Sequence, residues 1–253
     1  MDFHSFGNIE NPTMLLIHGV LTPWQIWNQQ IEHFSKSYYV IAVALDAHTE
    51  EPSEFISIED EAYTIENFCI NNEITTIDVL CGLSLGGAIA HLIWKNGKVN
   101  VNTLILDGAP LVPCGELIGN ILTSFYVDII KKSKARDEDT LKSCTEEFLP
   151  GKYLEDYLKI ADNISIDSVK NLISSVSTSN LCTTVDNHSN ILFIHGSKGN
   201  EVLAKKSAKK MQKNYPETTI KYFKDDPHCY RALRKPQEWI EVVQEYLDST
   251  VKH

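Results

Sequence analysis

The stretch CGLSLGG, residues 81–87, places a serine between glycines at the junction of two apolar segments. The residues before it, TTIDVL, predict a buried strand, and the residues after it, AIAHLIWK, predict a helix. Gly82, Ser84 and Gly86 have the G-x-S-x-G spacing, in which a sharp turn from strand to helix exposes the serine hydroxyl at the edge of a sheet. Two interpretations follow. Ser84 is a nucleophile held on a strained turn, or the glycines only allow the strand to turn tightly into the helix.

Apolar runs of similar length recur on both sides of this turn and alternate with segments of helical periodicity. Six runs predict buried strands: residues 13–19, 38–45, 75–82, 101–108, 190–196 and 218–223. Five segments between and after them predict helices: residues 23–35, 57–72, 86–97, 201–215 and 236–250. Such alternation is typical of a mostly parallel sheet covered on both faces. We therefore predict an α/β fold with a doubly wound, mostly parallel sheet, whose strands deliver polar side chains to their carboxyl edge.

The alternation stops between residues 109 and 189. Four amphipathic helical segments are predicted there instead: residues 114–134, 137–148, 151–161 and 165–179. A crossover between parallel strands needs only a dozen or so residues, so a helical stretch of about eighty residues is an insertion. We predict a core domain of residues 1–108 and 190–253 and a helical cap, or lid, of residues 109–189. The alternative is a helical subdomain that only completes the core.

The composition limits the partners that the chain can bind. Of the 253 residues, 43% are hydrophobic, which is enough to bury a large core. The formal net charge of -11 argues against binding to nucleic acid or anionic lipid, because both require clustered Lys and Arg. No apolar run is long enough to span a membrane, and the first residues lack the pattern of a secretion signal. The cysteines show no paired spacing, so we expect a cytoplasmic protein with reduced thiols.

A nucleophilic serine needs a base and a site for the developing oxyanion. His228 follows the last predicted strand in the loop KDDPHCYR, where it could take the proton of the serine. One N–H donor to the oxyanion comes from the residue after the nucleophile, Leu85, and the second comes from Val20 in the loop after the first strong strand. A plain turn at the strand end is the alternative for His18-Gly19 in that loop. No pair of histidines has zinc-ligand spacing, and we expect no metal site.

The ordered set LLIHGV, GLSLGG, LILDGAP, LFIHG and DPHCY resembles the α/β-hydrolase superfamily, in particular esterase-like and lipase-like members with a helical cap after the sixth strand of the family. The resemblance covers almost the whole chain. It implies a Ser-His-acid triad, a substrate pocket between the sheet edge and the cap, and no cofactor. Few residues precede LLIHGV, so we expect the antiparallel first strands of the family to be reduced or missing.

The acid of the triad is the point where the chain departs from the family pattern. After the seventh strand the family usually has Gly-x-x-Asp, but residues 196–199 of this chain read GSKG. We predict Glu201, which begins the next helix, as the acid that orients His228; interaction with the helix dipole is its alternative role. Asp107, at the end of a predicted strand, is the second candidate. Asn200 could orient the histidine without a charge.

These residues together lead to a functional hypothesis. The sequence predicts a carboxylesterase-like serine hydrolase in which Ser84 attacks an acyl carbonyl and His228 acts as base and then as acid. Trp24, which follows the loop that carries Val20 (the oxyanion loop), and Phe125, in the predicted cap, are candidates for the substrate pocket, and packing is their alternative role. The expected partner is a small-molecule acyl substrate, and a homodimer is left open. The alternatives are thioesterase, peptidase or lyase chemistry, or a ligand-binding protein that has lost the usual acid.

Overall fold

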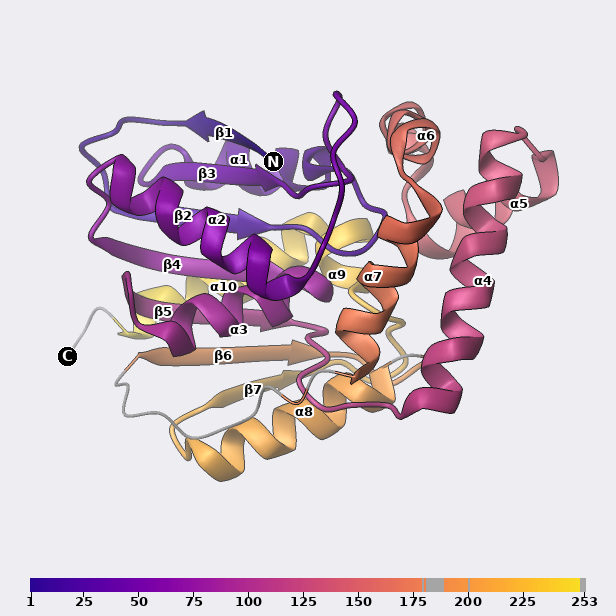
Figure 1. Cartoon of the computed structure of the whole chain (residues 1–253). Helices are drawn as coiled ribbons and strands as arrows, with labels where there is room; N and C mark the ends of the chain where they lie inside the picture. Colours follow the sequence, from indigo (N-terminus) through magenta and orange to yellow (C-terminus); the bar gives the residue numbers. More distant parts are fainter. Residues whose placement is uncertain (179, 181–188, 200, 251–253) are drawn as a thin grey trace.

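A central sheet organises the molecule, and helices pack on both of its faces (Figure 1). The computed structural model describes residues 1–178, 180, 189–199 and 201–250, and in this part of the chain seven strands form one sheet with the order β1-β3-β2-β4-β5-β6-β7. β1 is antiparallel to β3, and the other neighbouring pairs are parallel. The strands are β1 (Asp2–Phe6), β2 (Thr13–Ile17), β3 (Tyr39–Ala44), β4 (Thr76–Leu83), β5 (Asn100–Asp107), β6 (Asn190–His195) and β7 (Thr219–Tyr222).

The sheet confirms the predicted α/β fold, and the six predicted strands are present as β2 to β7. Their apolar runs are continuous because a parallel sheet covered on both faces buries both sides of each strand. Leu16, Leu80 and Leu104, from the neighbouring strands β2, β4 and β5, have no exposed surface. Full burial of one such side chain stabilises the fold by roughly 1.5–3 kcal/mol.

The sequence did not predict β1. This strand lies at the edge of the sheet, where none of its side chains is fully buried: Asp2 and Ser5 are exposed, and the other three are half-buried. The residues DFHSF therefore lack the apolar run that identifies the buried strands. Within the described residues, the antiparallel part of the sheet is thus reduced to one strand, as the resemblance implied.

Helices from the core cover both faces of the sheet. In Figure 1, α2, α3 and α8 lie in front of the sheet, whereas α1 and α10 lie behind it, where they contact each other. The predicted helix at 23–35 is a short 3-10 helix continued by α1, and the short helix α9 was not predicted. The bounds are η1 (Trp24–Trp27), α1 (Asn28–Phe34), α2 (Ile58–Asn71), α3 (Leu85–Asn96), α8 (Glu201–Asn214), α9 (Tyr230–Arg234) and α10 (Pro236–Thr250).

Residues 109–178, all of which the structure describes, contain helices and no strand. They stand at the end of the sheet toward which the parallel strands point (Figure 1). The four predicted segments correspond to α4 (Glu116–Lys134), α5 (Glu138–Ser143) with the π-helical turn η2 (Cys144–Phe148), η3 (Gly151–Tyr153) with α6 (Leu154–Asn163), and α7 (Ile166–Thr178). α4 and α7 pack closely, with Gly119 of α4 against Ser177. The predicted insertion of residues 109–189, called the helical insertion below, is therefore helical over its described residues 109–178; most of residues 179–189 lie outside the described part.

Two further properties concern the described residues as a whole. None of their helices combines the length and the apolar character needed to cross a membrane. Their five cysteines are free thiols, and Cys182 lies outside the described part of the chain.

Candidate active site

Ser84 stands on the turn that joins β4 to α3. Its backbone has φ 53° and ψ −112°, a conformation that is unfavourable for a residue with a side chain. The Ser84 N–H donates to the C=O of Asp107 at 2.8 Å and so ties the turn to the end of β5. Glycine would adopt such a φ without strain, whereas for serine the conformation costs about 1–3 kcal/mol. The strain at Ser84 therefore favours the interpretation that the turn presents a nucleophilic hydroxyl over the interpretation that the glycines only allow a tight turn.

The two glycines of the motif allow the strand, the turn and the helix to touch. A Cβ at Gly82 would lie 2.1 Å from the carbonyl oxygen of Gly86. A Cβ at Gly86 would lie 2.3 Å from the carbonyl oxygen of Ile17, at the end of β2. Both positions therefore exclude any side chain, and the backbones of β2, β4 and α3 approach more closely than other residues would permit.

His228 reaches Ser84 from the loop that precedes α9. Its Nε2 lies 2.9 Å from Ser84 Oγ, which is hydrogen-bonding distance. The imidazole is 30% exposed, so the pair stands at the surface of the site. A Cβ at Gly108 would lie 2.8 Å from His228 Cε1, which shows how closely the end of β5 supports the ring. The structure thus brings the predicted nucleophile and the predicted base together.

Glu201 contacts the other nitrogen of the same ring. Glu201 Oε1 lies 2.6 Å from His228 Nδ1, and Glu201 Oε2 accepts the N–H of Gly196 at 2.6 Å. The carboxylate has no exposed surface. Because a carboxylate accepts, Nδ1 carries the proton, and Nε2 is left as the acceptor for the Ser84 hydroxyl. Of the two candidate acids that the structure describes, Glu201 and Asp107, it places Glu201 against His228.

Asp107 has a different partner. Its Oδ2 accepts the Nε1–H of Trp239 at 2.9 Å, and its side chain is buried. Burial and the nearby Glu201 carboxylate raise the pKa of Asp107 to about 7. No hydrogen bond joins Asp107 to His228 in the described residues. The third candidate, Asn200, lies outside the described part of the chain.

The two predicted oxyanion donors, Val20 and Leu85, directly follow Gly19 and Ser84, two residues that lie beside each other. No described residue accepts a hydrogen bond from the N–H of Val20 or from that of Leu85, the first residue of α3. The loop that carries Val20 passes beside the serine, since a Cβ at Gly19 would lie 3.4 Å from the Ser84 Cβ. The start of α3 adds the positive end of a helix dipole. Two such N–H groups and a helix N-terminus beside a hydroxyl can bind a developing negative charge.

Trp24 and Phe125 occupy different surroundings. Trp24 lines a cavity of about 400 Å³ between β1, residues 48–53 and α6, and neither Ser84 nor His228 lines this cavity.

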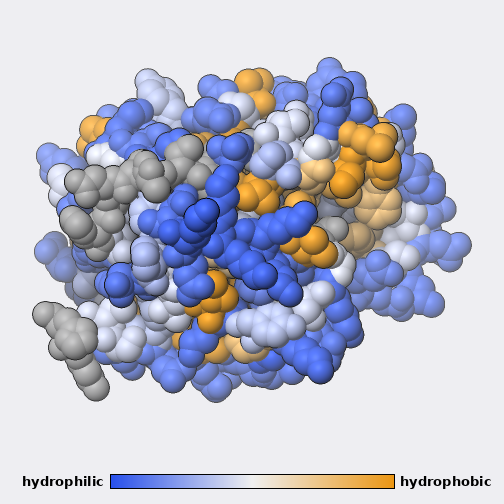
Figure 2. Space-filling view, turned by 90° about the horizontal axis from the view of Figure 1, so that it is seen from below, coloured by the Kyte–Doolittle hydropathy of each residue, from blue (hydrophilic) through white to orange (hydrophobic). Residues whose placement is uncertain are grey.

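Phe125 lies on α4, where it is 48% exposed and contacts the rings of Tyr126 and Phe148. It belongs to an exposed apolar row on α4, which also contains Leu117, Ile118 and Ile121. Figure 2 shows hydrophobic side chains gathered at the end of the molecule where α4 lies.

Sequence reasoning did not single out His48. It is buried, and its Nε2 accepts the N–H of Leu21 in the oxyanion loop at 2.9 Å. A histidine in the middle of the polar stretch DAHTEEPS carries no sequence signal for this contact. Among the described residues, no three His, Cys, Asp or Glu side chains are grouped as metal ligands would be.

No family model and no curated protein matches the sequence. Similarity appears at the level of structure. A protein of Desulfitobacterium hafniense assigned to the alpha/beta hydrolase family is 20% identical, with 97% of this chain and 100% of the other aligned and a TM-score of 0.78. An esterase from a marine microorganism is 17% identical, with 97% and 98% aligned and a TM-score of 0.77. MenH from S. aureus is 18% identical, with 98% and 97% aligned and a TM-score of 0.73. The chain has the α/β-hydrolase fold.

Proposed function

We propose that the protein is a serine hydrolase that cleaves a carboxylic ester of a small molecule. The proposal is carried by the unbroken hydrogen-bonded series from Ser84 Oγ through His228 to the buried carboxylate of Glu201, with distances of 2.9 and 2.6 Å. An activated nucleophile requires an accessible hydroxyl, a base within hydrogen-bonding distance of it, and a group that orients the base. Hydrolases and esterases among the structural neighbours support the same class of reaction.

The proposed reaction has two halves. His228 Nε2 takes the proton of Ser84 as Oγ attacks the carbonyl carbon, and the Val20 and Leu85 N–H groups hold the resulting oxyanion. Collapse of this intermediate breaks the ester bond, and His228 gives the proton to the departing alcohol. Water then attacks the acyl-enzyme with His228 again as base, which releases the acid and restores Ser84. Glu201 stabilises the imidazolium that forms in each half.

The helical insertion would act as a cap over this site, with residues 1–108 and 190–253 as the core domain. We assign contact with the non-reacting part of the acyl group to Phe125, which belongs to an exposed apolar row on α4. An apolar acyl group would cover that row and remove it from water. Trp24 lines a cavity that neither Ser84 nor His228 lines and stacks on the ring of His4, which supports its alternative role in packing.

The alternatives are less well supported. A ligand-binding protein without turnover would suit a chain whose usual acid position holds glycine, but the contact of Glu201 Oε1 with His228 Nδ1 at 2.6 Å supports turnover. Thioesters and peptides could use the same residues, and no feature of the described residues favours either over an ester.

A substrate panel tests the proposal. We expect hydrolysis of 4-nitrophenyl esters to exceed hydrolysis of thioesters and amino-acid anilides, and the Ser84→Ala variant to lose it. Turnover of anilides or thioesters alone would change the substrate class. Turnover that persists in Ser84→Ala, with its thermal unfolding unchanged, would remove Ser84 from the mechanism.

A further inference from the structure

The loop that carries Val20 is held in a conformation that needs support. Leu21, the next residue, has φ 53°, which costs energy for a residue with a side chain. Its N–H donates to His48 Nε2 at 2.9 Å. On the other side of Val20, the Gly19 N–H donates to Thr22 Oγ1 at 3.0 Å. The N–H groups before and after Val20 are therefore both occupied, while that of Val20 has no acceptor among the described residues.

The ring of His48 is fixed in one tautomer. Because Nε2 accepts the Leu21 N–H, the proton lies on Nδ1, which is 3.0 Å from the C=O of Asp46 and donates to it. The side chain is only 4% exposed, and burial lowers the pKa of His48 to about 4. The imidazole therefore remains neutral near pH 7 and keeps Nε2 available as an acceptor.

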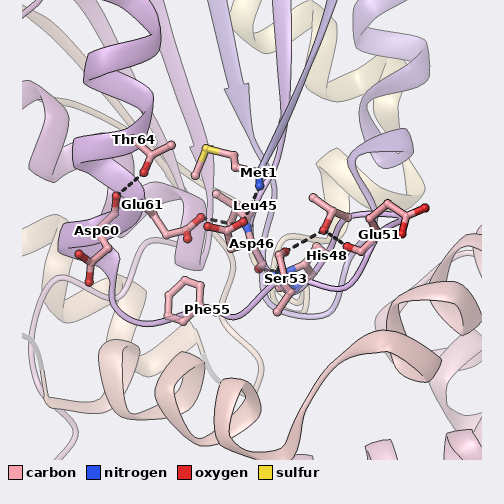
Figure 3. A network of polar contacts seen from close by, with 12 residues as sticks. Met1, Leu45, Asp46, His48, Glu51, Ser53, Phe55, Asp60, Glu61 and Thr64 are labelled. Atoms are coloured by element: carbon pink, nitrogen blue, oxygen red, sulfur yellow. Dashed lines mark hydrogen bonds and ion pairs between the residues drawn. The ribbon is translucent and has the colours of Figure 1, made fainter.

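The turn that presents His48 is itself tied together, as Figure 3 shows. The His48 N–H donates to the C=O of Leu45 at 2.9 Å, and the Ala47 N–H donates to Ser53 Oγ at 2.9 Å. Thr49 Oγ1 lies 2.8 Å from the same Ser53 hydroxyl. Asp46 donates its N–H to Glu61 Oε2 on α2 at 3.2 Å. These bonds leave the imidazole little freedom to move away from Leu21.

His18 links the same two segments, but its side chain comes from the loop after β2 and reaches the turn after β3. Its Nε2 accepts the N–H of Leu45, the residue after β3, at 3.1 Å, and its Nδ1 donates to the C=O of Gly19 at 2.8 Å. The His18 and His48 rings are 4.8 Å apart. Two buried neutral imidazoles thus link the oxyanion loop after β2 to the turn after β3.

We propose that His48 is a positioning residue of the oxyanion hole: by accepting the Leu21 N–H, it holds the loop in the conformation that leaves the Val20 N–H unpaired beside Ser84. This inference rests on the proposed function, because the position of Val20 matters for turnover only if Ser84 forms a tetrahedral intermediate. It predicts that His48 affects the transition state more than the bound substrate, because the oxyanion exists only in the transition state.

The variants His48→Leu and His48→Gln separate the acceptor from the bulk of the side chain. Leucine fills the space without an acceptor, whereas the glutamine amide oxygen can accept the Leu21 N–H. His91→Leu is the control, since His91 is equally buried on α3 and has no hydrogen bond to the oxyanion loop. The readouts are kcat and KM for 4-nitrophenyl acetate, inhibition by phenylboronic acid, which forms a tetrahedral adduct with serine, and hydrogen exchange at the Leu21 amide.

For His48→Leu we expect kcat to fall by about 10- to 100-fold with KM changed by less than about threefold, because one oxyanion donor is displaced. Phenylboronic acid should bind more weakly by a similar factor, and the Leu21 amide should lose its protection. In His48→Gln and His91→Leu, kcat should stay within about threefold of the unsubstituted protein.

Three outcomes would overturn the inference: a His48→Leu protein with unchanged kcat, a change confined to KM, or equal losses of kcat in His48→Leu and His48→Gln. A parent protein that hydrolyses no ester and binds no boronic acid would instead contradict the proposed function. The exchange of the Leu21 amide distinguishes the two failures, because it reports on the hydrogen bond with or without turnover.

Discussion

At the scale of single residues, two buried carboxyls lie close to one another and differ in their partners. Glu201 Oε2 accepts the Gly196 N–H, and Glu201 Oε1 contacts His228 Nδ1. Asp107 receives one from Trp239, and burial raises its pKa to about 7. Of these two carboxyls, Glu201 is therefore the one in position to orient the imidazole of His228.

Because Glu201 and Asp107 have different partners, we expect their replacement by the corresponding amides to have unequal effects on turnover. Glu201→Gln should lower kcat by about 10³- to 10⁴-fold, because an amide no longer fixes the tautomer of His228 or stabilises its charged form. Asp107→Asn should retain kcat within about tenfold, since the asparagine oxygen can still accept the Trp239 N–H. Steady-state kinetics on both variants measures this. The reverse order of effects would identify Asp107 as the acid.

At the scale of elements, the turn between β4 and α3 depends on close backbone contact. Gly86→Ala should destabilise the protein by roughly 3 kcal/mol or more, because its Cβ would lie 2.3 Å from the carbonyl oxygen of Ile17. Gly151→Ala, at the start of η3, should change stability by less than about 1 kcal/mol, since its Cβ would meet no atom closer than 4.0 Å. Urea denaturation compares the two variants, and equal losses would contradict the close contact between Gly86 and Ile17.

The apolar row of α4 allows a second test at this scale. If Phe125 contacts the acyl group, Phe125→Ser should lower kcat/KM for 4-nitrophenyl butyrate more than for the acetate, by roughly 0.8 kcal/mol for each methylene that loses contact. Stability should change little, because Phe125 is 48% exposed. Ile9→Ser is the control, since Ile9 is 70% exposed in the connection between β1 and β2. An unchanged butyrate preference in Phe125→Ser would exclude the contact.

At the scale of the whole molecule, the sequence predicted the strands and site residues that have a local residue pattern, and it did not predict contacts between segments that are distant in the chain. The runs that form β2 to β7 are apolar because both faces of the sheet are covered, and Ser84 and His228 follow from a motif and from chain order. The strand β1 was not predicted, because an edge strand is not buried on both faces and needs no continuous apolar run. Sequence spacing could not decide between Glu201 and Asp107, because the choice depends on where Trp239 and Gly196 lie in space. The contact of His48 with Leu21 joins two loops and has no local pattern.

Buried histidines also affect the stability of the whole fold. His91 is buried on α3, and neither ring nitrogen has a hydrogen-bond partner among the described residues. Burial lowers its pKa to about 3 from a usual value of 6.5. Below pH 6.5 the unfolded chain therefore binds a proton that the folded protein does not, so His91 reduces stability progressively as the pH falls toward its folded pKa.

His91→Leu should remove this penalty. Its advantage in free energy of unfolding over the parent protein should grow by about 2 kcal/mol between pH 7 and pH 5. The other histidines are the same in both proteins, so their contributions cancel in the difference. Urea denaturation at the two pH values gives the result, and an advantage that does not vary with pH would show that His91 is protonated in the folded state.

The proposed chemistry depends above all on Ser84 being a nucleophile that His228 activates. Covalent labelling of the folded protein with a fluorophosphonate tests this dependence, with the modified residue located by mass spectrometry. We predict one label per chain, on Ser84, that is absent in His228→Ala and after heat denaturation. A folded protein whose Ser84 remains unlabelled, or a label of equal rate in His228→Ala, would contradict the assignment of Ser84 and His228.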